Sequence, residues 1–125
     1  MFTPVVIEHF SNPRCVGELE NPTHGFEVGN SVCGDRIFVD MIFSGDRTVS
    51  DIRFRAYGCA TSIATGSLFC EVVTCHDLGH ILSMTREQQH ALLGEMDPSQ
   101  MHCRDLLEQL FVKLRETCAP EGVTP

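Results

Sequence analysis

The sequence predicts a single domain that joins an antiparallel β-hairpin to a series of helices. Two stretches in the first half of the chain alternate apolar and polar residues with the two-residue period of a strand. After residue 59 the apolar residues recur with the period of a helix, most clearly between residues 103 and 114. The chain has 125 residues, near the commonest size of one domain, so we expect one unit over residues 1–125 with a frayed tail after about residue 118.

The first element is expected to be a short helix near the start of the chain. Thr3 and Pro4 are a typical helix start, an N-cap residue followed by proline at the first helical position. Val6 and Phe10 then fall on one face, which predicts about two turns. The helix should end before Pro13, because a residue that precedes proline is disfavoured in the α conformation.

The hairpin is predicted from residues 36–43 and 51–57, which flank the turn formers of residues 44–47. Each strand has one apolar face, made of Ile37, Val39, Met41 and Phe43 in the first and of Ile52, Phe54 and Ala56 in the second. A third strand is expected around Glu27 to Ser31 from its position alone. The sheet should therefore bury one face.

Three helical segments are expected in the second half of the chain. The first runs from about residue 60 to Thr74, with Thr61 or Ser62 as its cap, and a less regular one covers residues 77–93. The last is capped by Asp97 and has an apolar stripe at Cys103, Leu107, Leu110, Phe111 and Leu114.

The composition excludes several classes of function. Nine basic and seventeen acidic residues give a net charge of −8, which repels phosphate backbones and anionic membranes, so we expect no nucleic-acid or membrane partner. The first residues have no basic segment typical of an export signal, and no apolar run reaches the roughly 18 residues of a membrane span. We therefore expect a cytoplasmic protein. Seven cysteines in that compartment favour metal or thiol chemistry over disulfides.

Metal-capable side chains occur in three groups, each at a junction between predicted elements: Cys33-Gly34-Asp35, Gly58-Cys59 and His102-Cys103. Cysteines at helix starts are favoured as thiolates by the positive end of the helix dipole. Thiolates, an imidazole and one carboxylate together suit Zn²⁺ or iron–sulfur chemistry better than Mg²⁺ or Ca²⁺.

Each group also has a purely structural explanation. An isolated cysteine is most often a small buried hydrophobe, and Cys103 lies on the apolar stripe of its helix. Asp35 after glycine is a common turn residue, and His102 alone is more often a surface histidine. No CxxC pair is present, so composition and spacing leave a shared metal site open.

From about Val6 to Leu114, the sequence resembles the IscU/NifU family of iron–sulfur cluster assembly scaffolds in the order of its motifs. The resemblance rests on the segments Ile7-Glu8-His9-Phe10-Ser11-Asn12-Pro13-Arg14, Gly17, Cys33-Gly34-Asp35, Phe54-Arg55-Ala56-Tyr57-Gly58-Cys59-Ala60-Thr61-Ser62-Ile63-Ala64 and His102-Cys103. It implies an α+β fold of the IscU/SufE-like kind, a small antiparallel three-stranded sheet with helices packed on one face.

The resemblance also implies the ligands and the activity. Cys33, Cys59 and Cys103 would be the assembly-site thiolates, and Asp35 and His102 would be the further ligands that complete or exchange at the site. We expect the side chains of Cys33, Asp35, Cys59 and Cys103 to converge at one point on the surface, with His102 at the rim of this point. A permanent [2Fe–2S] cluster usually has four cysteine ligands, so a carboxylate or imidazole in place of one suits a transient cluster.

The implied function is that of a non-enzymatic scaffold. It would take sulfur from a cysteine desulfurase, take iron, build a transient [2Fe–2S] cluster and pass it to apo-proteins; zinc is expected at the same ligands after purification in air. Residues 96–100 keep only the second proline of the Leu-Pro-Pro-Val-Lys site in the bacterial IscU branch, which disfavours the partnership with a dedicated Hsp70-type chaperone. A NifU-like or stand-alone scaffold fits better.

Two competing functions use the same ligands. One is a zinc protein that accepts sulfur, as in the SufU branch, which lacks the equivalent of His102. The other is a zinc hydrolase, which needs a general base such as Glu71 or Glu95 near the metal. Cys15, which stands where the family usually has Asn, and Cys70, Cys75 and Cys118 are assigned no role at the site.

Overall fold

The computed structural model describes residues 3–30, 34–43, 49–58, 60–75, 77–94 and 101–118 of the chain. Within these ranges it does not describe the side chains of residues 30, 60, 75, 101–103 and 118. The expected hairpin turn at residues 44–47, the cap at Asp97 and the tail after residue 118 lie outside the described residues.

The sheet has three antiparallel strands in the order β1-β2-β3, namely β1 (His24–Asn30), β2 (Asp35–Phe43) and β3 (Val49–Tyr57). The hairpin pairs Val39 with Phe54, and the third strand pairs Val28 with Ile37. These four side chains are at most 4% exposed, so the predicted apolar face is the buried face. The third strand is longer than expected, since it begins at His24 rather than at Glu27.

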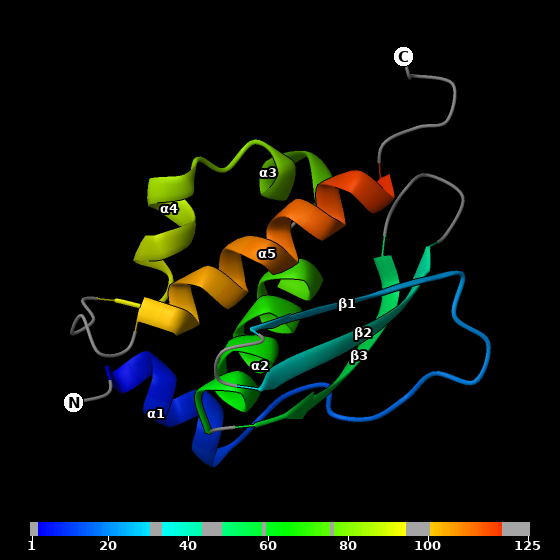
Figure 1. The fold of residues 1–125 in the computed structure, drawn as a ribbon. Helices are drawn as coiled ribbons and strands as arrows, with labels where there is room; N and C mark the ends of the chain where they lie inside the picture. Colours follow the sequence, from blue (N-terminus) through cyan, green and yellow to red (C-terminus); the bar gives the residue numbers. More distant parts are fainter. Residues whose placement is uncertain are drawn as a thin grey trace.

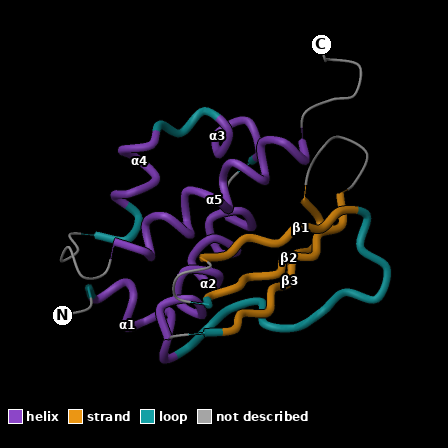
Figure 2. Tube along the Cα trace, in the orientation of Figure 1, coloured by secondary structure: helices purple, strands orange, loops and turns teal. Residues whose placement is uncertain are grey.

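Helices cover that one face of the sheet, as Figures 1 and 2 show. They are α1 (Pro4–Ser11), α2 (Ala60–Cys75), α3 (Leu78–Leu82), α4 (Arg86–Ala91) and α5 (Met101–Cys118). The α2 helix packs on β3 and α5 packs on β1, while α1 and α4 contact the sheet-packed helices α2 and α5 respectively. No helix among the described residues is long and apolar enough to cross a membrane.

The first helix follows the sequence prediction, and the later helices differ from it in detail. Thr3 caps α1 by accepting a hydrogen bond from the Val6 backbone N–H. The predicted caps of α2 are wrong: the helix begins at Ala60, so Thr61 and Ser62 lie in its first turn, where both are buried. The irregular stretch at residues 77–93 is two short helices, capped by Asp77 and Thr85.

The core lies between the sheet and helices α2 and α5. Phe69 of α2 makes edge-to-face contacts with Phe26 of β1 and Phe111 of α5, at centroid distances of 6.3 and 5.3 Å. The glycine in α2 allows closer packing on the sheet, because a Cβ at Gly66 would lie 2.6 Å from two ring carbons of Phe54. Phe54 is 1% exposed, so the ring has little room to move away.

The segment between α1 and β1 extends the sheet at the β3 edge. Val16 forms a parallel bridge with Phe54, whose backbone N–H donates to the Cys15 carbonyl while its own carbonyl accepts from Gly17, both at 2.9 Å. The segment then continues to the other side of the sheet, where the Thr23 N–H donates to the carbonyl of Met41. In Figure 1 this segment is the blue loop that runs below and beside the sheet.

Candidate functional site

Asp35 and Gly58 bring two of the three sequence groups into direct contact. Asp35 is the first residue of β2, and Gly58 follows the last residue of β3. A Cβ on Gly58 would lie 2.1 Å from Oδ1 of Asp35 and 2.9 Å from its Cα, so only glycine fits beside this carboxylate. The segments that contain residues 33–35 and 58–59 therefore meet at the same end of the sheet.

Glycine also meets Asp35 from the opposite neighbouring strand. A Cβ at Gly29 in β1 would lie 2.8 Å from the carbonyl oxygen of Asp35. Gly34, just before Asp35, has φ +75°, and a Cβ added there would have nothing within 4 Å. Glycine is therefore favoured at this position by the backbone conformation and not by a lack of space. Gly58 meets both requirements, because its φ is +119°. The two neighbouring strand ends therefore approach Asp35 closely, Gly58 at its carboxylate and Gly29 at its backbone carbonyl.

The third group lies in the first turn of α5. This helix begins at Met101, so His102 and Cys103 are its second and third residues. Further along the helix, the Gln109 side chain accepts a hydrogen bond of 3.3 Å from the backbone N–H of Gly29. Six residues of helix rise about 9 Å, so Cys103 lies about 9 Å from this contact, towards the start of α5.

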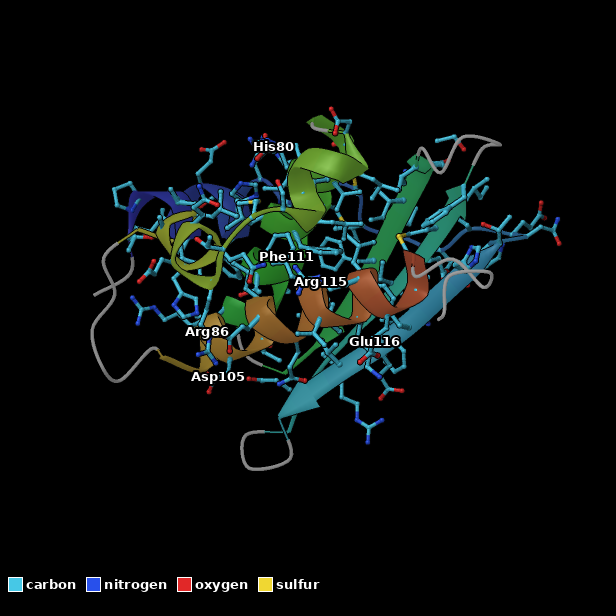
Figure 3. All side chains as sticks on the ribbon, turned by 90° about the horizontal axis from the view of Figure 1, so that it is seen from above. His80, Arg86, Asp105, Phe111, Arg115 and Glu116 are labelled. Carbon is cyan, nitrogen blue, oxygen red and sulfur yellow. The ribbon has the colours of Figure 1, made fainter. Side chains whose placement is uncertain are left out.

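The views of the fold agree with this placement. In Figure 1 the starts of α2 and α5, the end of β1, the start of β2 and the end of β3 all lie at the left end of the molecule. Figure 3 shows Asp105, two residues after Cys103, at the end of α5 that lies near the arrowhead of β1, and Glu116 at the opposite end. The described element ends that contain or precede and follow the five predicted ligands thus share one end of the fold.

The structure describes the predicted ligands to different extents. Cys33 and Cys59 lie outside the described residues, and so do the side chains of His102 and Cys103. Helix α2 begins at Ala60, so Cys59 stands immediately before a helix start, as predicted. Among the described residues no group of three or more His, Cys, Asp or Glu side chains is close enough to hold a metal ion.

Asp35 differs from the expectation of a surface ligand. Its side chain is 1% exposed. The reason is its register: it shares the helix-covered face of β2 with Ile37, Val39 and Met41. A carboxylate at the end of a buried face can remain there only if polar groups compensate for its loss of water.

Sequence reasoning missed a buried polar network around His9. The Ser67 hydroxyl lies 2.7 Å from Nδ1 of His9 and accepts a 2.8 Å hydrogen bond from the Arg14 backbone N–H. Ser67 therefore donates to Nδ1, and Nε2 carries the proton that faces Glu71 at 2.8 Å. Burial lowers the pKa of His9 despite the opposing effect of Glu71, so the imidazole is kept neutral.

The same network bears on the hydrolase alternative. Glu71, one of the two proposed general bases, is paired with His9 and lies eleven residues into α2. That corresponds to about 16 Å from the start of the helix. The other proposed base, Glu95, lies outside the described residues. The described part of the chain therefore places neither of the two proposed bases beside the candidate site.

A separate cavity of about 370 Å³ lies between α4 and α5. Arg86, Glu108 and Lys113 are among its lining residues, and Asp35, the one predicted ligand whose side chain is described, is not. Glu108 pairs with Arg86 and with His90 within the described part of α4 and α5. We treat the cavity as separate from the candidate site.

Comparison with known proteins identifies the family. Residues 1–113 match the family model described as the NifU-like N-terminal domain. The chain belongs to the NifU-like N-terminal domain family. This match confirms the resemblance to the IscU/NifU family that the sequence motifs indicated. The predicted α+β fold, with a three-stranded antiparallel sheet and helices on one face, is confirmed as well.

Named relatives of this NifU-like chain span most of its length. It is 37% identical over 106 residues to the iron–sulfur cluster assembly scaffold protein IscU 1 of Archaeoglobus fulgidus, covering 85% of this chain and 69% of that protein. It is 33% identical over 119 residues to the scaffold protein IscU of Aquifex aeolicus, covering 94% of this chain and 76% of that protein. A solved NifU-like N-terminal protein of Brucella abortus has the same fold, with a TM-score of 0.59 at 19% identity over 93% of this chain and 82% of that one.

Proposed function

We propose that this chain is an iron–sulfur cluster assembly scaffold. It takes sulfur from a cysteine desulfurase together with iron, builds a [2Fe–2S] cluster and transfers the cluster to apo-proteins. Family membership and relatives that are named as such scaffolds support the general role. The observation that supports the site is the contact of Asp35 with Gly58, which joins the Cys33 and Cys59 segments.

The proposed ligands are the three thiolates of Cys33, Cys59 and Cys103, with Asp35 and His102 as further ligands. The cluster is the cargo of the protein, so its ligands must both hold it and release it. Soft thiolates bind iron–sulfur clusters strongly, whereas a hard carboxylate exchanges more readily. Asp35 therefore serves as the exchangeable ligand, and it must turn from its buried position towards the cluster to do so.

The finer properties of the function belong to the same proposal. The protein acts as a scaffold without turnover of a substrate, in the cytoplasm, and zinc occupies the same ligands when it is purified in air. Its partners are a cysteine desulfurase and apo-protein acceptors. Partnership with a dedicated Hsp70-type chaperone is disfavoured by residues 96–100, which lie outside the described residues.

Anaerobic reconstitution tests the function directly. Metal-free protein is incubated with iron, cysteine and a desulfurase, and the visible absorption of a [2Fe–2S] cluster is followed until it is stable. An apo-ferredoxin is then added and the rate of cluster transfer is measured. A protein that binds zinc under these conditions but forms no cluster would be a zinc-dependent sulfur acceptor instead.

Asp35→Ala tests the role of the carboxylate. The variant should still assemble a cluster on the remaining ligands, but the half-life of the cluster in the presence of apo-ferredoxin should become longer. Asp105→Ala is the matched control, because it removes an exposed carboxylate near the same end of the molecule. Transfer from Asp35→Ala as fast as from wild type would contradict the exchange role, whatever the effect on melting temperature.

A further inference from the structure

Cys15 and Cys70 form a thiol pair that lies away from the candidate site. Cys15 belongs to the segment that follows α1, and Cys70 lies within α2, 55 positions later in the chain. Their side chains interact with each other, and both are free thiols in the structure. The pair is ten residues along α2 from Ala60, a rise of about 15 Å, so it does not belong to the predicted ligand set.

The backbone holds Cys15 firmly against α2 and the sheet. The residue before it is fixed by the Arg14 N–H, which donates to the Ser67 hydroxyl one turn before Cys70. The Cys15 carbonyl accepts a 2.9 Å hydrogen bond from the Phe54 N–H of β3. Because these two hydrogen bonds attach residues 14 and 15 to α2 and to β3, the fold holds Cys15 beside the turn of α2 that contains Cys70.

Cys15 adopts an unusual backbone conformation to make this contact. Its φ is +63°, and it is the one residue other than glycine with positive φ among the described residues. This left-handed region favours Gly, Asn and Asp, and a cysteine there is uncommon. The chain therefore has a cysteine beside Cys70 at a position where the backbone conformation favours glycine, asparagine or aspartate.

The two thiols differ in access and in acidity. Cys15 is half-buried, whereas Cys70 is completely buried, so a dissolved reagent reaches Cys15 first. The hydrogen bond from Cys70 and the nearby Arg53 guanidinium lower the pKa of Cys15 to about 7, against burial and the carboxylates of Asp51 and Glu71. Burial and the interaction with Cys15 raise the pKa of Cys70. At neutral pH a substantial fraction of Cys15 is therefore thiolate, whereas Cys70 remains a thiol.

We propose that Cys15 and Cys70 are a reversible thiol–disulfide pair that reacts with peroxides, with Cys15 as the attacking thiol and Cys70 as the resolving thiol. The Cys15 thiolate attacks one peroxide oxygen, the O–O bond breaks, and the products are a sulfenic acid and hydroxide, which is protonated to water. The Cys70 sulfur then displaces the sulfenic hydroxyl, which leaves with the Cys70 proton as water. The two thiols lose two electrons and two protons, and one hydrogen peroxide becomes two waters.

The geometry gives this reaction a defined outcome. The resolving sulfur belongs to the same buried cluster as the attacking one, so we expect the sulfenic acid to be captured within the molecule before irreversible oxidation. The product ties the segment after α1 to the middle of α2. A thiol reductant restores both cysteines, and the proposed cluster ligands take no part.

Peptide mapping of the full-length protein tests the proposal. Reduced, metal-free protein is treated with hydrogen peroxide, the remaining thiols are alkylated, and the protein is digested with trypsin and chymotrypsin without reduction. Cleavage after Leu19 and Phe69 separates Cys15 from Cys33 and Cys70 from Cys59. We expect a linked peptide pair containing Cys15 and Cys70 that disappears after dithiothreitol. The Cys75→Ser control, which removes the other cysteine of that peptide, should still form the link.

Two variants distinguish the roles of the thiols. In Cys70→Ala the sulfenic acid on Cys15 has no partner, so labelling of Cys15 by dimedone should increase at least tenfold over wild type. In Cys15→Asn, which suits the backbone, peroxide should leave Cys70 unmodified. Circular dichroism of both variants checks that they are folded. Absence of the linked pair in wild type at a tenfold excess of peroxide, or equal dimedone labelling in wild type and Cys70→Ala, would overturn the proposal.

The pH dependence of alkylation provides an independent measurement. The rate at which iodoacetamide modifies Cys15 should rise with a midpoint near pH 7. In Cys70→Ala the midpoint should move to higher pH, because the hydrogen-bond donor to the thiolate is lost while Arg53, Asp51 and Glu71 remain. An unchanged midpoint in this variant would show that the sulfurs do not interact in solution.

Discussion

Gly58→Ala is the substitution that most directly tests how the candidate site is built. The new methyl carbon would lie 2.1 Å from the Asp35 carboxylate oxygen and 2.9 Å from the Asp35 Cα. Carbon atoms in ordinary contact are about 3.5 to 4.0 Å apart, so either Asp35 or residue 58 must move. The backbone at Gly58 also has φ +119°, which an L-residue with a side chain adopts only under strain.

Gly34→Ala is a matched control for the strain. Gly34 also has positive φ, at +75°, but a Cβ there would have nothing within 4 Å. The left-handed backbone costs an alanine about 1–2 kcal/mol, which is the whole effect that we expect at Gly34. Gly58→Ala adds overpacking against Asp35, about 1–3 kcal/mol more, so its total effect should be roughly 2–5 kcal/mol. The difference between the two variants contains the contact with Asp35 together with the additional backbone strain at φ +119°.

Chemical denaturation measures both effects. The chain has no tryptophan and one tyrosine, so unfolding in guanidinium chloride is best followed by far-ultraviolet circular dichroism of the reduced, metal-free protein. Gly58→Ala should lower the denaturation midpoint further than Gly34→Ala at the same slope. Equal loss of stability in the two variants would refute the close packing of Gly58 on Asp35.

Three further predictions concern the core, the buried histidine and metal binding. Gly66→Ala should destabilise the fold by about 1 kcal/mol in the same denaturation assay, because overpacking against Phe54 exceeds the gain in helix propensity; a more stable variant would contradict the contact. The pKa of His9 is lowered in the fold, so the unfolded chain binds the proton more readily, and the free energy of unfolding should fall as the pH drops through about 6.5, the ordinary value. The free energy of unfolding of His9→Gln should lack this pH dependence. If the variant shows the same pH dependence as wild type, another titratable group causes it. Saturating zinc should raise the melting temperature of metal-free wild type more than that of Cys33→Ser, and an equal rise in both would place the zinc at other residues.

The sheet was predictable from the sequence because one of its faces is covered. Alternation in residues 36–43 and 51–57 arises from that burial, and it located both long strands to within a residue or two. The β1 strand was harder to place, because it begins with His24 and Gly25, which have low strand propensity. It forms because the free edge of β2 and the side of α5 offer it partners, and neither is visible in its own residues.

The predicted site and the buried side-chain pairs depended on different kinds of information. Asp35 and Gly58 were selected from motif order, and their contact agrees with that selection. The burial of Asp35 was not foreseen, because a charged residue at a strand start is usually exposed. The hydrogen bond between Cys15 and Cys70 joins residues far apart in the chain with no local pattern, so only the tertiary structure places them together.

The position of Asp35 connects the fold to the proposed chemistry. The alternation that buries Ile37 and Val39 places Asp35 on the same face, at the first position of the strand. There the carboxylate occupies the space beside Gly58 that a side chain would otherwise fill. In the proposed function, a carboxylate that turns outward to bind iron must leave this space and expose the backbone of Gly58, and its return must close it again. We infer that the proposed ligand states of Asp35 and the backbone conformation at Gly58 change together, so a substitution that fixes either one should slow both the assembly and the release of the cluster.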